Sequence, residues 1–199
     1  GFVGQATRLL ETDNQKFLIY DVDSSKCVPV GLKLEGMLDC KIIFICVPTP
    51  MNPDGSCCTN IVEKVINNLR EINFKNHIVV RSTVTPGFSQ KHKVNFMPEF
   101  LTEKNWADDV YNCENWIIGK YDINTEYLQD LLNRAMYDNK IKYNKLITVS
   151  PMEGEMIKYV RNTFLATKIS FFNEIEEICR KNYLNYNLIK NNVSLDTRI

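Results

Sequence analysis

Short runs of β-branched and aromatic residues alternate with more polar stretches along the first three quarters of the chain. Four of these runs have the length of a strand and are bounded by turn-forming residues: Phe17–Tyr20, Ile42–Val47, His77–Val80 and Trp116–Ile118. Between two of them, Thr59–Ile72 carries apolar residues at helical spacing, with Thr59 placed to cap its N-terminus. Strands that alternate with helices predict an α/β fold with a doubly wound, mostly parallel sheet and helices on both faces.

A second kind of pattern begins at Ser150. Ser150 suits a helix cap, Pro151 the first helical position, and Glu153 the third position of a capping box. No strong helix breaker follows until about Asn182, so we predict a helix of roughly 45 Å at 1.5 Å per residue. A shorter helix is expected over Leu184–Val193. We therefore expect an α/β domain over residues 1–149, and the start of a helical dimerisation segment over residues 150–199.

The composition narrows the classes of partner. Of 199 residues, 44% are hydrophobic, and 24 Lys and Arg balance 24 Asp and Glu, so no basic field favours nucleic acid or an anionic membrane. The apolar runs are shorter than the roughly 20 residues of a membrane span, and no signal peptide is visible at the N-terminus. Seven cysteines without a C-x-x-C pair, and two histidines without ligand spacing, predict no metal site. We expect reduced thiols and a cytoplasmic protein.

The chain opens with Gly1-Phe2-Val3-Gly4, and the predicted strand Phe17–Tyr20 ends in Asp21, 17 positions after Gly4. In a Rossmann-like domain such glycines let a pyrophosphate approach the backbone, and an acid about 20 residues later binds the ribose. An acid rather than an arginine favours NAD over NADP. The strand and the glycine that open the full motif are not in the chain, so we expect the sheet to lack its first strand. A simple tight turn would also explain this half-motif, and Asp23 could take the place of Asp21.

Four further segments follow in a fixed order: Cys46–Pro50 with Asp54-Gly55-Ser56, Arg81–Val84 with Pro86-Gly87, Pro98–Leu101 with Glu103, and Lys158 with Asn162–Ala166. Together they resemble the UDP-glucose/GDP-mannose dehydrogenase family, whose segments include S-T-V-x-P-G, P-E-F-L-x-E and K-x-x-x-N-x-F-L-A. The resemblance is collinear and covers essentially the whole chain. It implies NAD-dependent oxidation of the C6 alcohol of a sugar nucleotide to a carboxylate in two steps, with the intermediate held on a cysteine.

The resemblance also assigns roles to single residues. Lys158 and Asn162 lie four apart on the predicted helix, so their side chains leave one face about 6 Å apart and can converge on one oxygen. A lysine ammonium and an amide donor there would stabilise a developing alkoxide. Glu99 matches the glutamate that activates or positions water for thioester hydrolysis, and Thr83 the threonine that holds the same water and touches the cofactor. Without the resemblance, Lys158 would be read as one more solvated lysine.

The resemblance implies four catalytic residues: Lys158, Asn162, Glu99 and Thr83. It also implies larger sets of cofactor-binding and substrate-binding residues. The expected NAD-binding residues are Gly1, Phe2, Val3, Gly4, Asp21, Lys26, Val47, Pro48, Thr49, Thr83 and Glu103. The expected substrate-binding residues are Glu99, Phe100, Leu101, Lys158, Asn162, Ile169 and Arg198. Arg198 matches an arginine that reaches the substrate of the neighbouring subunit, a task that suits its bidentate fork.

The chain departs from the family pattern in one chemical respect. None of its cysteines stands in a G-x-x-G-x-C context, so we expect the nucleophile beyond Ile199 and no complete oxidation by these 199 residues alone. Met97 and Trp106 replace smaller residues and leave the sugar preference open. The expected function is oxidation of UDP-glucose to UDP-glucuronate by a homodimer or larger homo-oligomer. The alternatives are a dehydrogenase for UDP-N-acetylmannosamine or GDP-mannose, and a non-catalytic nucleotide-binding or assembly module.

Overall fold

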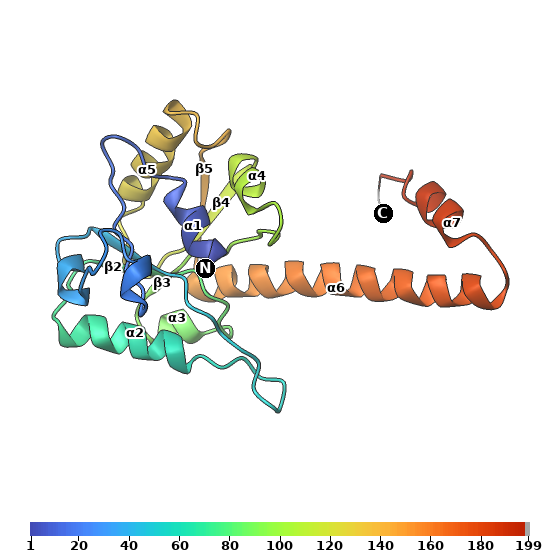
Figure 1. The fold of residues 1–199 in the computed structure, drawn as a ribbon, viewed down its shortest axis with the longest axis horizontal. Helices are drawn as coiled ribbons and strands as arrows, with labels where there is room; N and C mark the ends of the chain where they lie inside the picture. The colour runs from blue at the N-terminus through green and yellow to red at the C-terminus, as the bar shows by residue number, and fades with distance from the viewer. Residues whose placement is uncertain (198–199) are drawn as a thin grey trace. The chain divides into compact units, whose positions relative to one another are not determined.

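A computed structural model describes residues 1–197, which divide within one long helix into two compact units, Gly1–Lys158 and the chain from Tyr159 onward. The first unit contains a five-stranded sheet of β1 (Ile42–Ile45), β2 (His77–Val80), β3 (Asn95–Phe96), β4 (Asn115–Gly119) and β5 (Lys145–Val149), in that spatial order (Figure 1). All neighbouring pairs are parallel except β3 and β4. The predicted α/β fold with a mostly parallel sheet is confirmed.

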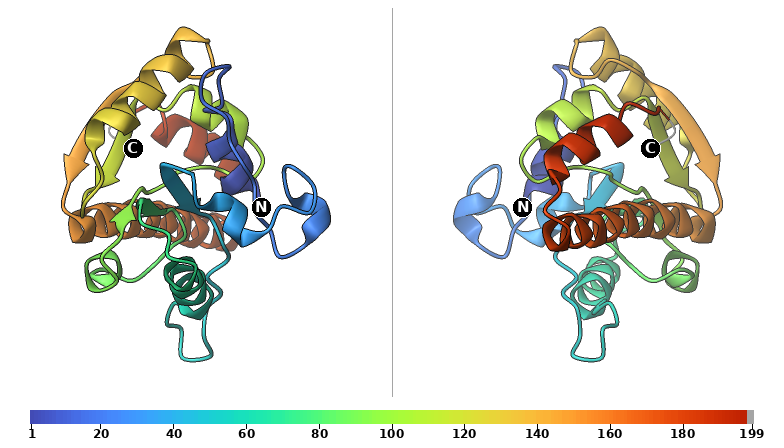
Figure 2. Two further views of the ribbon diagram at one scale, coloured as in Figure 1. Left: turned by 90° about the vertical axis from the view of Figure 1, so that its left-hand side faces the viewer. Right: turned by 90° about the vertical axis from the view of Figure 1, so that its right-hand side faces the viewer.

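Helices of the first unit lie on both faces of this sheet (Figures 1 and 2). They are α1 (Phe2–Arg8), α2 (Asn60–Glu71), α3 (Phe88–Lys91), α4 (Trp106–Tyr111), α5 (Thr125–Tyr137) and the start of α6 (Pro151–Lys181). Two clusters of buried apolar side chains form the core of this unit. Alternate residues of β2 contribute to one or the other, because successive side chains of a strand point to opposite faces. Val79 joins the cluster beneath α5, while Ile78 and Val80 join the cluster beneath α2.

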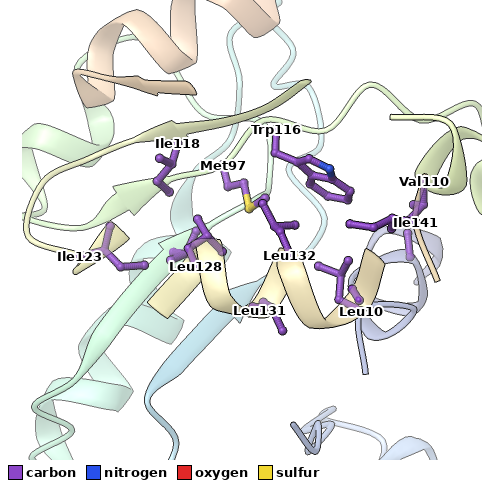
Figure 3. Packing of buried hydrophobic residues seen from close by; sticks show 13 residues of the cluster. Leu10, Met97, Val110, Trp116, Ile118, Ile123, Leu128, Leu131, Leu132 and Ile141 are labelled. Carbon is purple, nitrogen blue, oxygen red and sulfur yellow. The ribbon is translucent and has the colours of Figure 1, made fainter. Parts of the chain in front are cut away.

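The core beneath α5 is built from large apolar side chains on one helical stripe. Figure 3 shows Leu128 and Leu132 of α5 facing Trp116 and Ile118, and Met97 completes the layer. Burial of such side chains contributes about 1.5–3 kcal/mol each. This cluster fixes the sheet from which the site residues extend.

The predicted strand Phe17–Tyr20 is wrong. Ile19 exchanges backbone hydrogen bonds of 3.0 and 2.8 Å with Val28 as an isolated bridge, and Leu18 and Tyr20 are exposed. Phe17 stacks on Phe44 of β1, with ring centroids 6.4 Å apart, but the backbone of the segment pairs with none of the five sheet strands and so forms no ladder. Beyond it, the stretch to Cys40 holds two 3₁₀ helices, Ser24–Lys26 and Leu34–Met37, in place of a further strand and helix.

The capping residues predicted for two helices can be compared with the structure. Ser150 and Glu153 form the predicted capping box at the start of α6, with hydrogen bonds of 2.7 and 3.3 Å between each side chain and the other residue's backbone N–H. Thr59 occupies the cap position of α2, but its hydroxyl donates to the carboxylate of Glu63 at 3.0 Å instead of accepting from the backbone. The predicted N-cap position is therefore confirmed, but the Thr59 side chain makes no capping hydrogen bond.

The second unit contains the remainder of α6 and α7 (Tyr186–Val193), which Asn185 caps by accepting from the Leu188 N–H at 3.1 Å. α6 ends at Lys181, one residue before the expected breaker, and α7 begins two residues later than predicted. None of the helices described over residues 1–197 combines the length and the apolar character that a membrane crossing requires.

Candidate active site

Three segments that carry expected site residues leave the sheet at one edge. β1, β2 and β3 are parallel, and Cys46, Arg81 and Met97 directly follow their carboxyl ends. In open α/β sheets, ligands bind outside the carboxyl ends of the strands. The loops that begin at these three residues hold Thr49, Thr83 and Glu99, so the topology collects them on the edge where chemistry is expected.

An ion pair between Lys158 and Glu99 lies at this edge. Lys158 extends from the second turn of α6 and its side chain is 2% exposed, while that of Glu99 is 14% exposed. The Lys158 ammonium donates to Glu99 Oε1, and Glu99 Oε2 accepts from the Leu101 N–H at 3.0 Å. Burial lowers the pKa of Lys158, against the opposing effect of Glu99. Lys158 is therefore not a solvated surface lysine.

Two further groups, the buried Arg81 and the half-buried Cys46, adjoin this pair. Arg81 is 3% exposed; its Nη1 lies 3.6 Å from Met97 Sδ, and desolvation lowers its pKa while Cys46 and Glu99 oppose that shift. Burial raises the pKa of the Cys46 thiol, which lies 3.8 Å from the Thr7 hydroxyl. In the sequence, Arg81 stands out only as part of a motif. Its position directly after a buried strand that ends at the ligand edge was the available signal.

Glu155 anchors the helix that carries Lys158. It is completely buried, and its carboxylate accepts from the Gly87 N–H at 2.5 Å and the Ser89 N–H at 2.8 Å. Gly87 has φ of +93°, a left-handed conformation that glycine adopts without strain. Sequence reasoning did not single out Glu155. The contact joins α6, one turn before Lys158, to the turn that follows Thr83.

A close approach of backbones also fixes the start of α6. A Cβ on Gly119, the last residue of β4, would lie 2.8 Å from the Pro151 Cα, which is too close. Gly154 stands opposite, where a Cβ would meet Gly119 Cα at 3.4 Å. The first turn of α6 can therefore rest on the end of β4 because residue 119 is a glycine, while a side chain at Gly154 would be tight but not excluded.

The N-terminal segment leaves room beside Gly4. A Cβ on Gly4 would meet only Cys46 Cβ, at 3.8 Å. Phe2 and Val3 precede it at the start of α1. Room next to backbone N–H groups, above the end of β1, fits the approach of a dinucleotide phosphate.

The two candidate ribose acids differ in their surroundings. Asp23 caps the first 3₁₀ helix by accepting from the Ser25 N–H at 3.1 Å and the Ser25 hydroxyl at 2.6 Å, and it pairs with Lys26 at 3.1 Å. The Ser25 hydroxyl, followed by Lys26, lowers the pKa of Asp23, and its hydrogen bond to Asp23 raises the pKa of Lys26. Asp21 is half-buried and accepts from the Asp23 N–H at 3.0 Å. These contacts favour Asp21 as the acid available to a ribose.

The loops after β1 and β2 are tied together. The Ser82 hydroxyl donates to the Val47 carbonyl at 2.7 Å, and the Cys57 thiol donates to the Thr83 carbonyl at 3.3 Å. Pro48 and Thr49 continue from Val47 along the same edge. Of the expected NAD-binding residues, those near the first and second strands therefore occupy one region.

Other expected residues are not brought into this group. Phe100 and Leu101 are half-buried beside Glu99, whereas Glu103 is exposed in the turn before α4. Asn162 and Ile169 belong to the second unit and are exposed on α6. Arg198 lies outside the described residues. Over residues 1–197, no group of three or more His, Cys, Asp and Glu side chains could hold a metal ion.

Comparison with known proteins identifies the same family along both parts of the chain. Residues 5–140 match the NAD binding domain of the UDP-glucose/GDP-mannose dehydrogenase family, and residues 152–199 match the central domain of the same family. The UDP-glucose 6-dehydrogenase of Rickettsia felis is 32% identical over 210 residues, which cover 98% of this chain and 46% of that protein.

Two solved structures are also similar. A ternary complex of GDP-mannose dehydrogenase from Pseudomonas aeruginosa has a TM-score of 0.70 and 26% identity, and the match covers 83% of this chain and 41% of that one. A UDP-glucose dehydrogenase from the archaeon Pyrobaculum islandicum has a TM-score of 0.67 and 29% identity, with the same two coverages. The chain spans less than half the length of these relatives.

Proposed function

The chain belongs to the UDP-glucose/GDP-mannose dehydrogenase family, and from that premise we propose that the protein oxidises the C6 alcohol of a sugar nucleotide to a carboxylate with NAD. The specific reaction proposed is the conversion of UDP-glucose to UDP-glucuronate. The observation that carries the proposal is the buried Lys158–Glu99 pair at the carboxyl edge of the sheet. A protein that only binds a nucleotide has no physical need for two desolvated charges at that place.

Lys158 is the proposed donor to the reacting oxygen. Its ammonium is held in a water-poor site by Glu99 and by the anchored start of α6, so it needs little reorganisation as negative charge develops. Asn162 is the proposed second donor, one helical turn further along. The substrate oxygen would accept a hydrogen bond from the ammonium group that now donates to Glu99.

Glu99 has two proposed roles because its two oxygens have different partners. Oε1 orients Lys158, and Oε2 is held by the Leu101 N–H, which fixes the plane of the carboxylate. Release of Lys158 toward substrate would leave Oε1 free to accept a proton from water, the task of a general base in thioester hydrolysis. Thr83 is the proposed second contact of that water. Phe100, Leu101, Ile169 and Arg198 are the remaining proposed substrate contacts.

The residues near the first two strands fit NAD. NAD, when bound, supplies the hydride acceptor. We propose that the segment from Gly1 to Gly4 lies against its phosphates, that Asp21 and Lys26 hold its adenosine ribose end, and that Val47, Pro48, Thr49, Thr83 and Glu103 line the rest. The room beside Gly4 and the half-buried carboxylate of Asp21 support this arrangement. Residues 1–149 form the proposed NAD-binding domain.

Residues 150–199 are the proposed start of a central domain that forms a homodimer or larger homo-oligomer. Apolar side chains of the second unit remain exposed in the single chain, among them Phe164, Leu165, Ile169 and Phe171. A helix with this many uncovered apolar side chains needs a further surface to pack on. All seven cysteines are free thiols, which supports a cytoplasmic location.

The sugar nucleotide is tested by measuring NADH absorbance with the full-length protein and three substrates. We expect the highest kcat/KM with UDP-glucose. A higher value with GDP-mannose, which the similarity to the Pseudomonas enzyme makes the second candidate, or with UDP-N-acetylmannosamine, would keep the chemistry and change the substrate. Binding of NAD without turnover of any of the three would support a non-catalytic module.

A further inference from the structure

Asp109, in α4, holds the loop that carries Glu99. Asp109 is half-buried, and one of its carboxylate oxygens, Oδ2, accepts hydrogen bonds from both the N–H and the hydroxyl of Thr102, at 2.6 Å each. Hydrogen bonds to an ionised acceptor are shorter and stronger than those between neutral groups. The two bonds therefore fix the backbone and the side chain of Thr102 together, across seven positions of the chain.

Thr102 stands directly after the residue whose N–H orients Glu99. The Leu101 N–H donates to Glu99 Oε2 at 3.0 Å. The next N–H along the chain, that of Thr102, donates to Asp109. Because peptide groups are planar, only the φ and ψ angles of Leu101 separate these two N–H groups. The Leu101 side chain packs against the core beneath α5, so the directions of the two N–H groups are linked, and Asp109 fixes one of them.

We propose that Asp109 is a positioning residue for Glu99, and that it acts through the contact with Thr102 to hold the Glu99 carboxylate in the orientation of a general base. This role rests on the proposed oxidation, in which Glu99 accepts a proton from water. In that step the water oxygen bonds to the thioester carbon and one water proton passes to Glu99 Oε1. The carbon–sulfur bond breaks, which leaves a carboxylic acid and the cysteine thiolate. A displacement of about 1 Å can cost roughly 10²-fold in rate, so the orientation of the loop matters.

Rapid mixing of the full-length protein with NAD and the sugar nucleotide of highest turnover tests this role, because NADH absorbance follows the oxidation steps that precede hydrolysis. Asp109→Ala removes the acceptor of both hydrogen bonds. We expect its steady-state rate to fall about tenfold or more, while the rate of the first phase of NADH formation stays within about twofold. Asp108→Ala, at the adjacent exposed position of α4, is the matched control and should change neither rate. An equal loss in both phases of Asp109→Ala, or no loss in either, would overturn the proposal.

Further variants separate the parts of the contact. Thr102→Val removes the hydroxyl and keeps the N–H, so we expect part of the loss seen in Asp109→Ala. Thr102→Ser keeps both donors and should match the unsubstituted protein, and a loss equal to that of Thr102→Val would contradict the role of the hydroxyl. Asp109→Asn keeps the shape of the side chain and removes its charge. It should show the same selective fall of the steady-state rate, to a smaller degree, even if Asp109→Ala does not fold.

Backbone hydrogen exchange measures the contact without turnover. We expect Asp109→Ala and Asp109→Asn to raise the exchange rates of the Leu101 and Thr102 N–H groups, about tenfold or more in Asp109→Ala, and Asp108→Ala to leave them unchanged. Unchanged exchange in both Asp109 variants would overturn the action of Asp109 and leave the proposed function intact. No NADH from the unsubstituted protein with any of the three sugar nucleotides would instead refute the proposed function, and with it the role of Glu99 as a base.

Discussion

Lys158 shows how burial decides the meaning of a charged residue. A lysine on a helix is normally solvated, and only its distant partner, 59 positions earlier in the chain, makes its burial tolerable. Removal of one member leaves the other desolvated without a partner. This is why the pair, and not either residue alone, is the unit of the site.

Lys158→Ala is expected to lower turnover by roughly 10²–10³-fold, because a preorganised donor to developing negative charge is lost. It should also lower the free energy of unfolding by about 3 kcal/mol, because Glu99 remains partly buried without its partner. Turnover and urea unfolding measure the two effects. Lys168→Ala, at an exposed position further along α6, is the matched control. Equal turnover of the two variants would contradict the role of Lys158.

Asp21 and Asp23 provide a comparison of two nearby carboxylates. Asp21→Asn is expected to raise the KM for NAD roughly tenfold or more, since a hydrogen bond to a charged group contributes about 1.5–3 kcal/mol. Asp23→Asn should change it less, because Asp23 is engaged with Ser25 and Lys26. Steady-state kinetics with varied NAD measure both. A larger effect at Asp23 would reverse the assignment.

The sequence alone says least about which individual side chains contact each other. The family resemblance indicated Glu99 and Lys158, but no local pattern could show that they contact each other, since the contact depends on the packing of α6 against the loop after β3. Arg81 and Glu155 were missed as individual residues for the same reason. Their burial is a property of the sheet edge and the α6 anchor, which exist only in the folded chain.

Among the helices and strands, those with strong local sequence patterns were predicted correctly. The strand His77–Val80 has the predicted bounds, and the capping box at Ser150 marks the start of α6. The strands β3 and β5 were not predicted. β3 has only two residues, and β5 is not a run of buried apolar residues, so neither shows the sequence pattern of a strand. Phe17–Tyr20 met that pattern and is not a strand, because a strand also needs a neighbour.

Glu155 makes a prediction about how one element is fixed. Glu155→Gln is expected to lower the free energy of unfolding by about 1–3 kcal/mol, because an amide group replaces a carboxylate that accepts two backbone N–H groups in a buried place. Turnover should fall as well, since the start of α6 positions Lys158. Urea unfolding and the NADH assay measure these effects, with Glu174→Gln, at an exposed position of α6, as the control. Wild-type stability in Glu155→Gln would show that the anchor is dispensable.

At the scale of the whole molecule, the sequence predicted the fold class and NAD as cofactor, and both are confirmed. The boundary between the two compact units falls inside α6. No change in composition shows this boundary in the sequence, because one continuous helix belongs to both units. The proposed subunit contacts therefore fall in the part of α6 that leaves apolar side chains uncovered.

Phe164→Asp is expected to shift the full-length protein from dimer or larger oligomer toward monomer. The carboxylate would be desolvated in the proposed interface, at a cost of several kcal/mol. Light scattering after size-exclusion chromatography gives the mass, and Thr167→Asp, at an exposed position that already carries a polar side chain, is the control. An unchanged mass for Phe164→Asp would place the subunit contact elsewhere.

The proposed oxidation of an alcohol to a carboxylate consumes two NAD for each sugar nucleotide. The most direct measurement is the number of NADH formed per UDP-glucose consumed by the full-length protein, from absorbance and from the sugar nucleotide remaining. We expect a ratio of two, with the rate strongly reduced in Lys158→Ala. A ratio of one would mean that oxidation stops at the aldehyde. No NADH from UDP-glucose, GDP-mannose or UDP-N-acetylmannosamine would refute the proposed oxidation.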